Sequence, residues 1–172
     1  MLRRPGAWIG RFNNMEREIT ELAIAGVSFQ PLRIIPTPQG PVLHMLRADY
    51  PLMPSFPAGF GEIYFSEIYP RKIKAWKRHA SQEQLFAVPA GLIKLVLFDS
   101  RADSSTRGSI VEMLLGRPDH YGLLRIPAGI WYGFQCRSDY PALVCNCANI
   151  PHDPEDNERK SPDNSDIPYR WE

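Results

Sequence analysis

Hydrophobic and polar residues alternate in short runs along most of the chain, and this period of two is typical of β-strands. Residues 62–69 (EIYFSEIY) are rich in β-branched and aromatic residues and end at Pro70. Residues 92–98 (LIKLVLF) are almost wholly apolar, which predicts a central, buried strand. Further strands are predicted at residues 72–79, 109–115, 122–127, 130–135 and 142–149. Strands at this spacing, interrupted by Gly and Pro, favour a β-sandwich or barrel.

The same alternation predicts which side chains share a face, because residues two apart on a strand point the same way. We expect three of these faces to meet inside the barrel. Their residues are Ile73, Ala75, Lys77 and His79 on the first strand, Ile130, Tyr132 and Phe134 on the second, and Leu143, Cys145, Cys147 and Asn149 on the third.

Two stretches near the start of the chain differ from this pattern. Residues 14–25 predict a short helix, with Asn14 as its N-cap and Gly26 as the residue that ends it. Residues 29–61 contain seven prolines and therefore allow only short edge strands.

These features divide the chain into an N-terminal extension with the helix, residues 1–30, and a single domain, residues 31–172. The end of that domain, residues 152–172, is polar and acidic. We expect this tail to wrap over the surface.

Composition and charge exclude several classes of protein. Twenty basic and 19 acidic residues leave a net charge of +1, which argues against a protein that binds nucleic acid by bulk charge. No apolar run reaches the length of about 20 residues that spans a bilayer, and the first ten residues lack the apolar segment of a signal peptide. We expect neither a nucleic-acid nor a membrane partner. Three cysteines without a C-x-x-C spacing indicate reduced thiols in a cytoplasmic protein.

Three segments carry motifs in a characteristic order. The first is residues 99–108 (DSRADSSTRG), the second is residues 126–134 (IPAGIWYGF), and the third is residues 152–171, which begin with HDP and end with IPYRW. Together they resemble the dTDP-4-dehydrorhamnose 3,5-epimerase family, whose patterns are D-x-R-x-x-S-P-T-x-G, I-P-x-G-F-A-H-G-F and W-D-D-P…I-x-W. The resemblance implies a cupin, an all-β double-stranded β-helix (jelly roll), here with a short N-terminal helix. It also implies a homodimer that acts on nucleotide-linked 4-keto sugars.

The resemblance carries the family's catalytic positions onto residues of other types. The family's basic motif R-G-L-H falls on the segment from Lys74 to Lys77, so its catalytic His falls on Lys77, with His79 two residues later. A second family His falls on Tyr132, and the catalytic Tyr falls on Cys145.

Other family positions concern support of the catalytic His and ligand binding. The family's Lys falls on Gln84, and the Asp that supports the catalytic His falls on Asp163 or Asn164. Arg47 corresponds to an early Arg of the family, and Glu62 and Tyr64 fall where the family reads thymine with Gln and Asn. The candidate substrate-binding residues are Arg47, Glu62, Lys74, Asp163 and Cys145.

Epimerisation beside a keto group requires a base, a donor to the enolate oxygen, and an acid that returns a proton from the opposite face. His79, Tyr132 and Lys77 form the candidate catalytic set, and such a set serves epimerisation or ketoisomerisation. The predicted function is therefore an isomerase or epimerase of a dTDP- or other nucleotide-linked 4-keto sugar. The alternative is a catalytically inactive sugar-nucleotide-binding or structural cupin, in which an inward His and Tyr are only a hydrogen-bonded core pair.

A metal-dependent cupin is the rival enzyme class. Its pattern H-x-H-x₃–₄-E with a later His aligns with Lys77, His79, Glu83 and Tyr132, so two of the four ligands are missing. A lysine at a ligand position also repels a divalent cation. We therefore expect no metal and no other cofactor.

Overall fold

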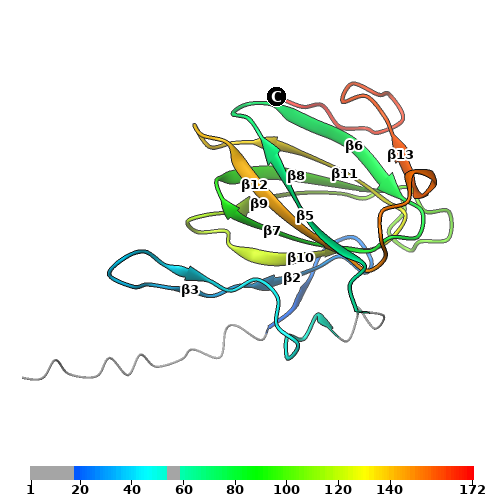
Figure 1. Ribbon diagram of the computed structural model, residues 1–172. Coiled ribbons are helices and arrows are strands. Elements are labelled where there is room, and N and C mark those ends of the chain that lie inside the picture. The colour runs from blue at the N-terminus through cyan, green and yellow to red at the C-terminus, as the bar shows by residue number, and fades with distance from the viewer. Residues whose placement is uncertain (1–17, 54–58) are drawn as a thin grey trace, which may run out of the picture.

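The computed structural model describes residues 18–53 and 59–172. Their strands form two large antiparallel β-sheets that face each other and a separate two-stranded sheet of β3 and β4 (Figure 1). Sheet I has the strand order β1-β2-β10-β7-β12-β5, and sheet II has the order β13-β6-β11-β8-β9. The strands are β1 (Thr20–Glu21), β2 (Ser28–Pro31), β3 (Ile34–Ile35), β4 (Val42–Leu43), β5 (Glu62–Ile68), β6 (Ile73–His79), β7 (Gln84–Ala90), β8 (Leu92–Asp99), β9 (Ile110–Gly116), β10 (Gly122–Ile126), β11 (Ile130–Cys136), β12 (Ala142–Ala148) and β13 (Asn157–Arg159).

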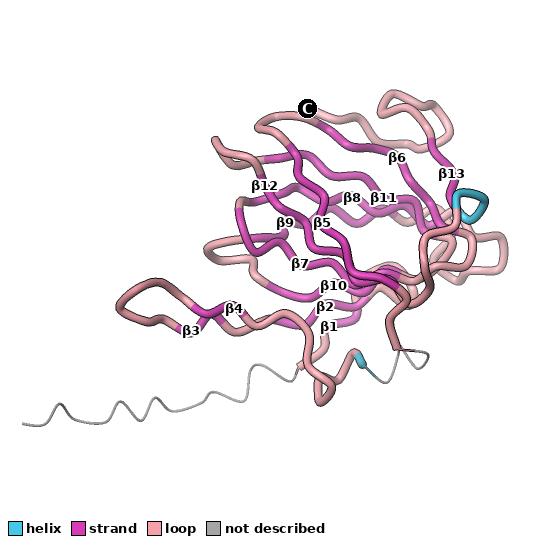
Figure 2. The backbone as a smooth tube through the Cα atoms, viewed as in Figure 1, coloured by secondary structure: helices cyan, strands magenta, loops and turns pink. Residues whose placement is uncertain are grey.

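This all-β jelly roll confirms the predicted fold class. Strands and loops make up nearly all of the described chain (Figure 2), and a short 3₁₀ turn, η3 (Pro154–Asp156), precedes β13. No helix in the described residues is long or apolar enough to cross a membrane.

The predicted N-terminal helix is wrong where the structure describes it, and residues 14–17 lie outside the described residues. Residues 18–25 instead form β1 and a turn, in which Thr20 pairs with Phe29 of β2. The backbone N–H of Leu22 donates to the carbonyl of Val27 at 2.9 Å. This turn buries Ile24 completely in the core, and that burial outweighs the weak local preference for a helix.

The main hydrophobic core fills the space between the sheets. It includes fully buried residues of β8 such as Leu95 and Leu97, together with Phe86 of β7 and Ile130 of β11. Strand β8 is buried over most of its length, as its apolar run predicts.

Each sheet also has a covering layer on its outer face. Parts of the proline-rich segment, among them Leu32 and residues 43–52, pack on sheet I, where Leu52 and Leu85 are buried together. The tail packs on sheet II, where Ile167 and Trp171 contact Trp76. Residues 35–42, at the β3–β4 hairpin, do not cover this sheet, and Ile35 and Val42 are 36% and 52% exposed. We expect part of the proline-rich segment to lie on a partner's sheet, and this stays a prediction.

The first family-like motif forms a tight loop around one buried carboxylate. Asp99 ends β8 and is completely buried, and it accepts hydrogen bonds from the side chains of Arg101, Ser104 and Thr106. Thr106 and Arg101 in turn bond the backbone of Ala25, at 3.0 and 2.8 Å. The motif therefore joins the loop after β8 to the N-terminal turn, and its role in this structure is architectural.

Candidate active site

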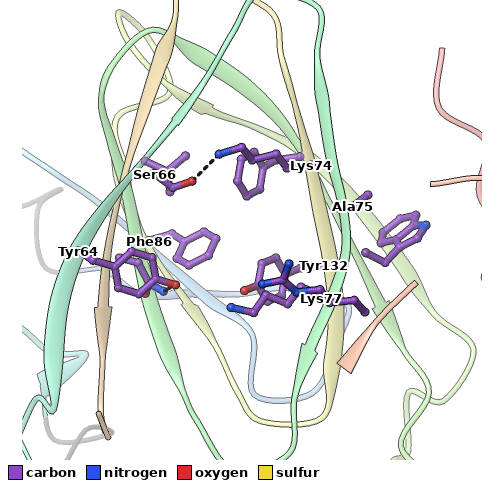
Figure 3. A pocket seen from close by; sticks show the side chains of 12 residues that line it. Tyr64, Ser66, Lys74, Ala75, Lys77, Phe86 and Tyr132 are labelled. Atoms are coloured by element: carbon purple, nitrogen blue, oxygen red, sulfur yellow. Dashed lines mark hydrogen bonds between the residues drawn. The ribbon is translucent and has the colours of Figure 1, made fainter. Parts of the chain in front are cut away.

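A cavity of about 420 Å³ lies between the two sheets (Figure 3). Both sheets and β13 contribute residues to it, because the inner faces of β5, β7 and β12 meet those of β6 and β11. The lining residues are Tyr64, Ser66, Lys74, Ala75, Trp76, Lys77, Phe86, Tyr132, Phe134, Val144, Asn146 and Arg159. The cavity thus combines aromatic walls with cationic and hydroxyl groups.

An irregularity in β6 decides which of its side chains reach the cavity. The pairing of β6 with β11 shifts between Tyr132 and Phe134, which pair with Lys77 and Lys74 respectively. One extra residue of β6 is therefore accommodated, and Lys74 and Lys77, three apart, both line the cavity.

This shift corrects the predicted face of β6. We expected Ile73 and Ala75 to point inward with Lys77. Instead Ile73 lines the outer groove of the tail, whereas Ala75 lines the cavity and also packs against the cluster around Trp76. Gly133 of β11 permits the shift, because a Cβ at that position would lie 2.5 Å from the Cβ of Ala75.

Lys77 and Tyr132 form a directly paired couple on neighbouring strands of sheet II. Burial and the nearby charge of Arg159 lower the pKa of Lys77, while Glu62 and Asp156 act in the opposite direction. Burial raises the pKa of Tyr132 far above its usual range, with a smaller contribution from Tyr64. At neutral pH, Tyr132 is thus a hydrogen-bond donor, and Lys77 loses its proton more readily than an ordinary lysine.

His79 lies behind this couple and does not line the cavity. Its side chain is 3% exposed, and its ring stacks on that of Tyr132 at a centroid distance of 6.3 Å and an interplanar angle of 12°. Nδ1 lies 3.2 Å from Oδ2 of Asp156, whereas Nε2 is buried without a partner in the described structure. Burial and the charge of Lys77 lower the pKa of His79 to about 4, so this ring is neutral at pH 7.

The carboxylate that holds His79 is Asp156, in the 3₁₀ turn of the tail. It also accepts hydrogen bonds from the backbone N–H groups of Ser81 and Gln82, at 2.7 and 3.1 Å. Burial raises the pKa of Asp156, but these bonds outweigh burial and the pKa is lowered. The turn that contains Gly129 meets the same strand end, because its N–H donates to the carbonyl of His79 at 2.7 Å.

Asp163, which the resemblance placed beside the catalytic His, lies elsewhere. It is exposed and lines an outer groove of the tail together with Asn164 and Tyr169. The sequence signal that would have identified Asp156 is its position just after Pro154, where a 3₁₀ turn brings it to the end of β6.

The wall of sheet I carries Tyr64 and Ser66 on β5 and Asn146 on β12. Nδ2 of Asn146 donates to the hydroxyl of Tyr64 at 2.8 Å, and these two residues pair across the strands. Lys74 reaches over from sheet II and donates to the hydroxyl of Ser66 at 3.0 Å and to the carbonyl of Glu67 at 2.6 Å.

Strand β12 points the other way from our expectation. Val144 and Asn146 line the cavity, whereas Cys147 packs in the outer cluster of sheet I and Cys145, two residues earlier, shares its side. Burial raises the pKa of the Cys145 thiol, so it is a neutral, buried group. The position that the resemblance assigns to a catalytic Tyr therefore does not face the cavity.

Two further predicted residues differ in their distance from the cavity. Glu62, at the start of β5, is near enough to raise the pKa values of Lys77 and Tyr64 by its charge, although it does not line the cavity. Arg47 lies in the outer layer, where it forms a two-bond ion pair with Asp49, and it is not brought to the cavity.

Of the predicted site, the structure brings together Lys74, Lys77 and Tyr132, with His79 directly behind them. Sequence reasoning missed Asn146 and Arg159. Asn146 belongs to the other alternating set of β12 side chains, the one that we did not choose. Arg159 lies opposite Lys77 because β13 pairs with β6. Among the residues that the structure describes, no three His, Cys, Asp or Glu side chains are grouped so that they could hold a metal ion.

Comparison with known proteins gives consistent matches. Residues 71–172 match the family model described as dTDP-4-dehydrorhamnose 3,5-epimerase. The chain is 31% identical over 150 residues to a protein of Haloferax volcanii named "Probable low-salt glycan biosynthesis epimerase", covering 85% of this chain and 88% of that protein. It is 32% identical over 114 residues to a spore coat polysaccharide biosynthesis protein of Bacillus subtilis, covering 65% and 75%.

Solved structures agree with these matches. A crystal structure of a dTDP sugar isomerase from Desulfovibrio desulfuricans is 51% identical, with a TM-score of 0.84, and the match covers 88% of this chain and 94% of that one. A 4-keto-6-deoxy sugar epimerase from Streptomyces spheroides has a TM-score of 0.80 at 19% identity, covering 96% and 83%. At 19% identity, the similarity to the Streptomyces protein shows a shared fold only.

Proposed function

Because the chain belongs to the dTDP-4-dehydrorhamnose 3,5-epimerase family, we propose that it is an isomerase or epimerase of a dTDP- or other nucleotide-linked 4-keto sugar. The observation that carries this proposal is the pair of Lys77 and Tyr132 side by side in the cavity between the sheets. One is an amine with a lowered pKa and the other a phenol that keeps its proton. Together they supply a base and an oxyanion donor.

In this mechanism Lys77 is the catalytic base. Its neutral amine removes the proton from a carbon next to the keto group, and the C–H electron pair moves to form the enolate. Tyr132 donates a hydrogen bond to the oxygen on which negative charge develops, a kind of interaction that lowers barriers most in a site shielded from water. We place the base at Lys77 rather than His79, since His79 does not line the cavity and has a pKa of about 4.

His79 then has a positioning role. Its neutral ring stacks on Tyr132, and Asp156 holds it in place, so it fixes the phenol from behind. Lys74 and Arg159 add positive charge to the cavity, and this charge supports binding of the diphosphate of a nucleotide sugar.

The enzyme is expected to act as a cytoplasmic homodimer. All three cysteines are unpaired thiols, which is consistent with a reducing compartment. Strand β5 is the last strand of sheet I, and its outer face carries Ile63 and Phe65 at 49% and 64% exposure. A second copy that covers this apolar face would explain why the last strand of sheet I leaves two large hydrophobic side chains exposed.

The test is proton exchange in deuterated water with dTDP-linked 4-keto sugars. The wild-type protein is expected to place deuterium next to the carbonyl. Lys77→Met should lower this exchange by about 10²–10⁴-fold, the usual contribution of a general base. Lys72→Met is the matched control, because Lys72 is exposed just before β6 and should leave exchange unchanged.

Calorimetric binding with the same sugar nucleotides separates the alternatives. Binding without exchange in the wild-type protein would favour the inactive binding module. If Lys77→Met exchanged at the wild-type rate, the assignment of the base would be wrong.

A further inference from the structure

Tyr64 occupies the wall of the cavity opposite Lys77 and Tyr132. It projects from β5 of sheet I, whereas Lys77 and Tyr132 project from β6 and β11 of sheet II, and Figure 3 shows the two groups on opposite sides of the open space. A sugar ring bound between the sheets would thus have Lys77 on one face and Tyr64 on the other.

The hydrogen bond to Asn146 orients the phenol of Tyr64. The amide Nδ2–H of Asn146 donates at 2.8 Å, so the phenol oxygen is the acceptor and its own hydrogen remains to be donated. Asn146 is 1% exposed, and its Oδ1 is buried without a partner in the described structure. An unsatisfied polar atom in the cavity wall points to a ligand with a donor group, such as a sugar hydroxyl.

The protonation state of Tyr64 suits an acid. Burial raises the pKa of Tyr64, the bond from Asn146 opposes this increase, and the charge of Glu62 adds to it. The hydroxyl is therefore protonated at neutral pH. Strand β12 offers no alternative phenol, because its cavity-lining residues are Val144 and Asn146.

We propose that Tyr64 is the catalytic acid that delivers a proton to the sugar carbon from the face opposite Lys77. The inference rests on the proposed function and extends it. When the enolate forms, the O–H bond of Tyr64 breaks and its proton bonds to the carbon, while the enolate pair restores the C=O bond. Lys77 is left as an ammonium and Tyr64 as a phenolate. Water then takes the proton from Lys77 and supplies one to Tyr64, so that the next turnover can begin.

The principal experiment measures exchange and inversion separately for Tyr64→Phe. We expect exchange next to the carbonyl to continue, since Lys77 can return a deuteron to the face from which it took the proton. Inversion should fall by at least about 100-fold, because the opposite face has lost its donor. Tyr69→Phe is the matched control, because Tyr69 is 64% exposed just after β5 and should leave both rates unchanged.

The outcomes distinguish the two proposals. Absence of exchange in the wild-type protein overturns the proposed function itself. Exchange in the wild-type protein with normal inversion by Tyr64→Phe overturns only the role of Tyr64. An equal loss of exchange and inversion in this variant also overturns it, since that pattern places Tyr64 in binding or proton abstraction.

A second measurement needs no variant. In a single turnover in ordinary water, a substrate deuterated at the reacting carbon should give inverted product with hydrogen from solvent, because the proton comes from Tyr64. Substantial deuterium in the inverted product would mean that Lys77 returns the label itself, and this result would overturn the two-sided mechanism.

Discussion

The buried carboxylate of Asp99 gives the sharpest prediction about stability. It accepts five hydrogen bonds: three from the backbone and guanidinium of Arg101, at 2.8 to 3.0 Å, and two from Ser104 and Thr106, at 2.6 and 2.7 Å. Asp99→Asn keeps the shape of the side chain but removes its charge. The amide NH₂ that replaces one carboxylate oxygen cannot accept hydrogen bonds from the donors around it.

Breaking a buried ion pair by removing one partner costs about 3–5 kcal/mol. We expect a value near the lower limit, about 3 kcal/mol, because the Arg101 side chain is 28% exposed and keeps its bond to Ala25. For a chain of this size, each kcal/mol lowers the melting temperature by about 2–4 °C, so the expected decrease is about 6–12 °C. Asp103→Asn, in the same loop but exposed, should change the free energy of unfolding by less than about 0.5 kcal/mol.

The pH dependence provides an independent check. Burial raises the pKa of Asp99, but the bonds from Arg101, Ser104 and Thr106 outweigh burial and hold it well below its usual range. A carboxyl with a lowered folded-state pKa stabilises the protein fully above its unfolded pKa of about 3.9 and loses this effect as pH falls further. In urea unfolding, the free energy of unfolding of Asp99→Asn should therefore differ from that of the wild type by the full amount at pH 7 and by less below pH 4. A difference under about 1 kcal/mol at pH 7, or one that does not narrow in acid, would refute the reasoning.

Three further results are expected. The exchange rate should rise with pH to a plateau, with a midpoint below the ordinary lysine pKa of about 10.4, because the pKa of the base Lys77 is lowered. A midpoint near 4 would transfer the role of base to His79. Asp156→Asn should weaken sugar-nucleotide binding, measured by calorimetry, and destabilise the fold by about 2 kcal/mol, since the carboxylate joins the tail to β6 through charge-assisted hydrogen bonds; unchanged binding would contradict the link. Light scattering should give about twice the chain mass of 19.6 kDa, and Phe65→Lys should halve it; a monomeric wild type would contradict the homodimer.

Alternation and apolar runs predicted β5, β6 and β8 to β12, because both patterns depend on burial. They did not predict β7 (Gln84–Ala90), which lies between β10 and β12 in sheet I. Residues 62–69 and 92–98 lie where β5 and β8 form. The N-terminal helix failed because a weak local preference at residues 14–25 competed with pairing to β2 and burial of Ile24. No local pattern reveals such a long-range contact.

The site was harder to predict than the fold because it depends on which of two alternating sets of side chains on each strand faces the cavity. Counting by twos along β6 cannot include the shift at Ala75, so Lys74 was placed from the resemblance and not from alternation. The same counting placed Cys145 inside and overlooked Asn146. Asp156 was missed because the resemblance pointed to Asp163, and the turn after Pro154 that brings Asp156 to His79 was not considered.

The route of the tail also has a consequence for how the protein matures during synthesis. Tyr64 and most of the cavity wall are translated well before Asp156 and Arg159, which hold His79 and complete the cavity. Because domains emerge from the ribosome from the N-terminus, the two sheets can begin to form while the cavity still lacks one side. Prematurely terminated chains would then be compact yet without activity, and proton transfer would begin only after the tail has docked.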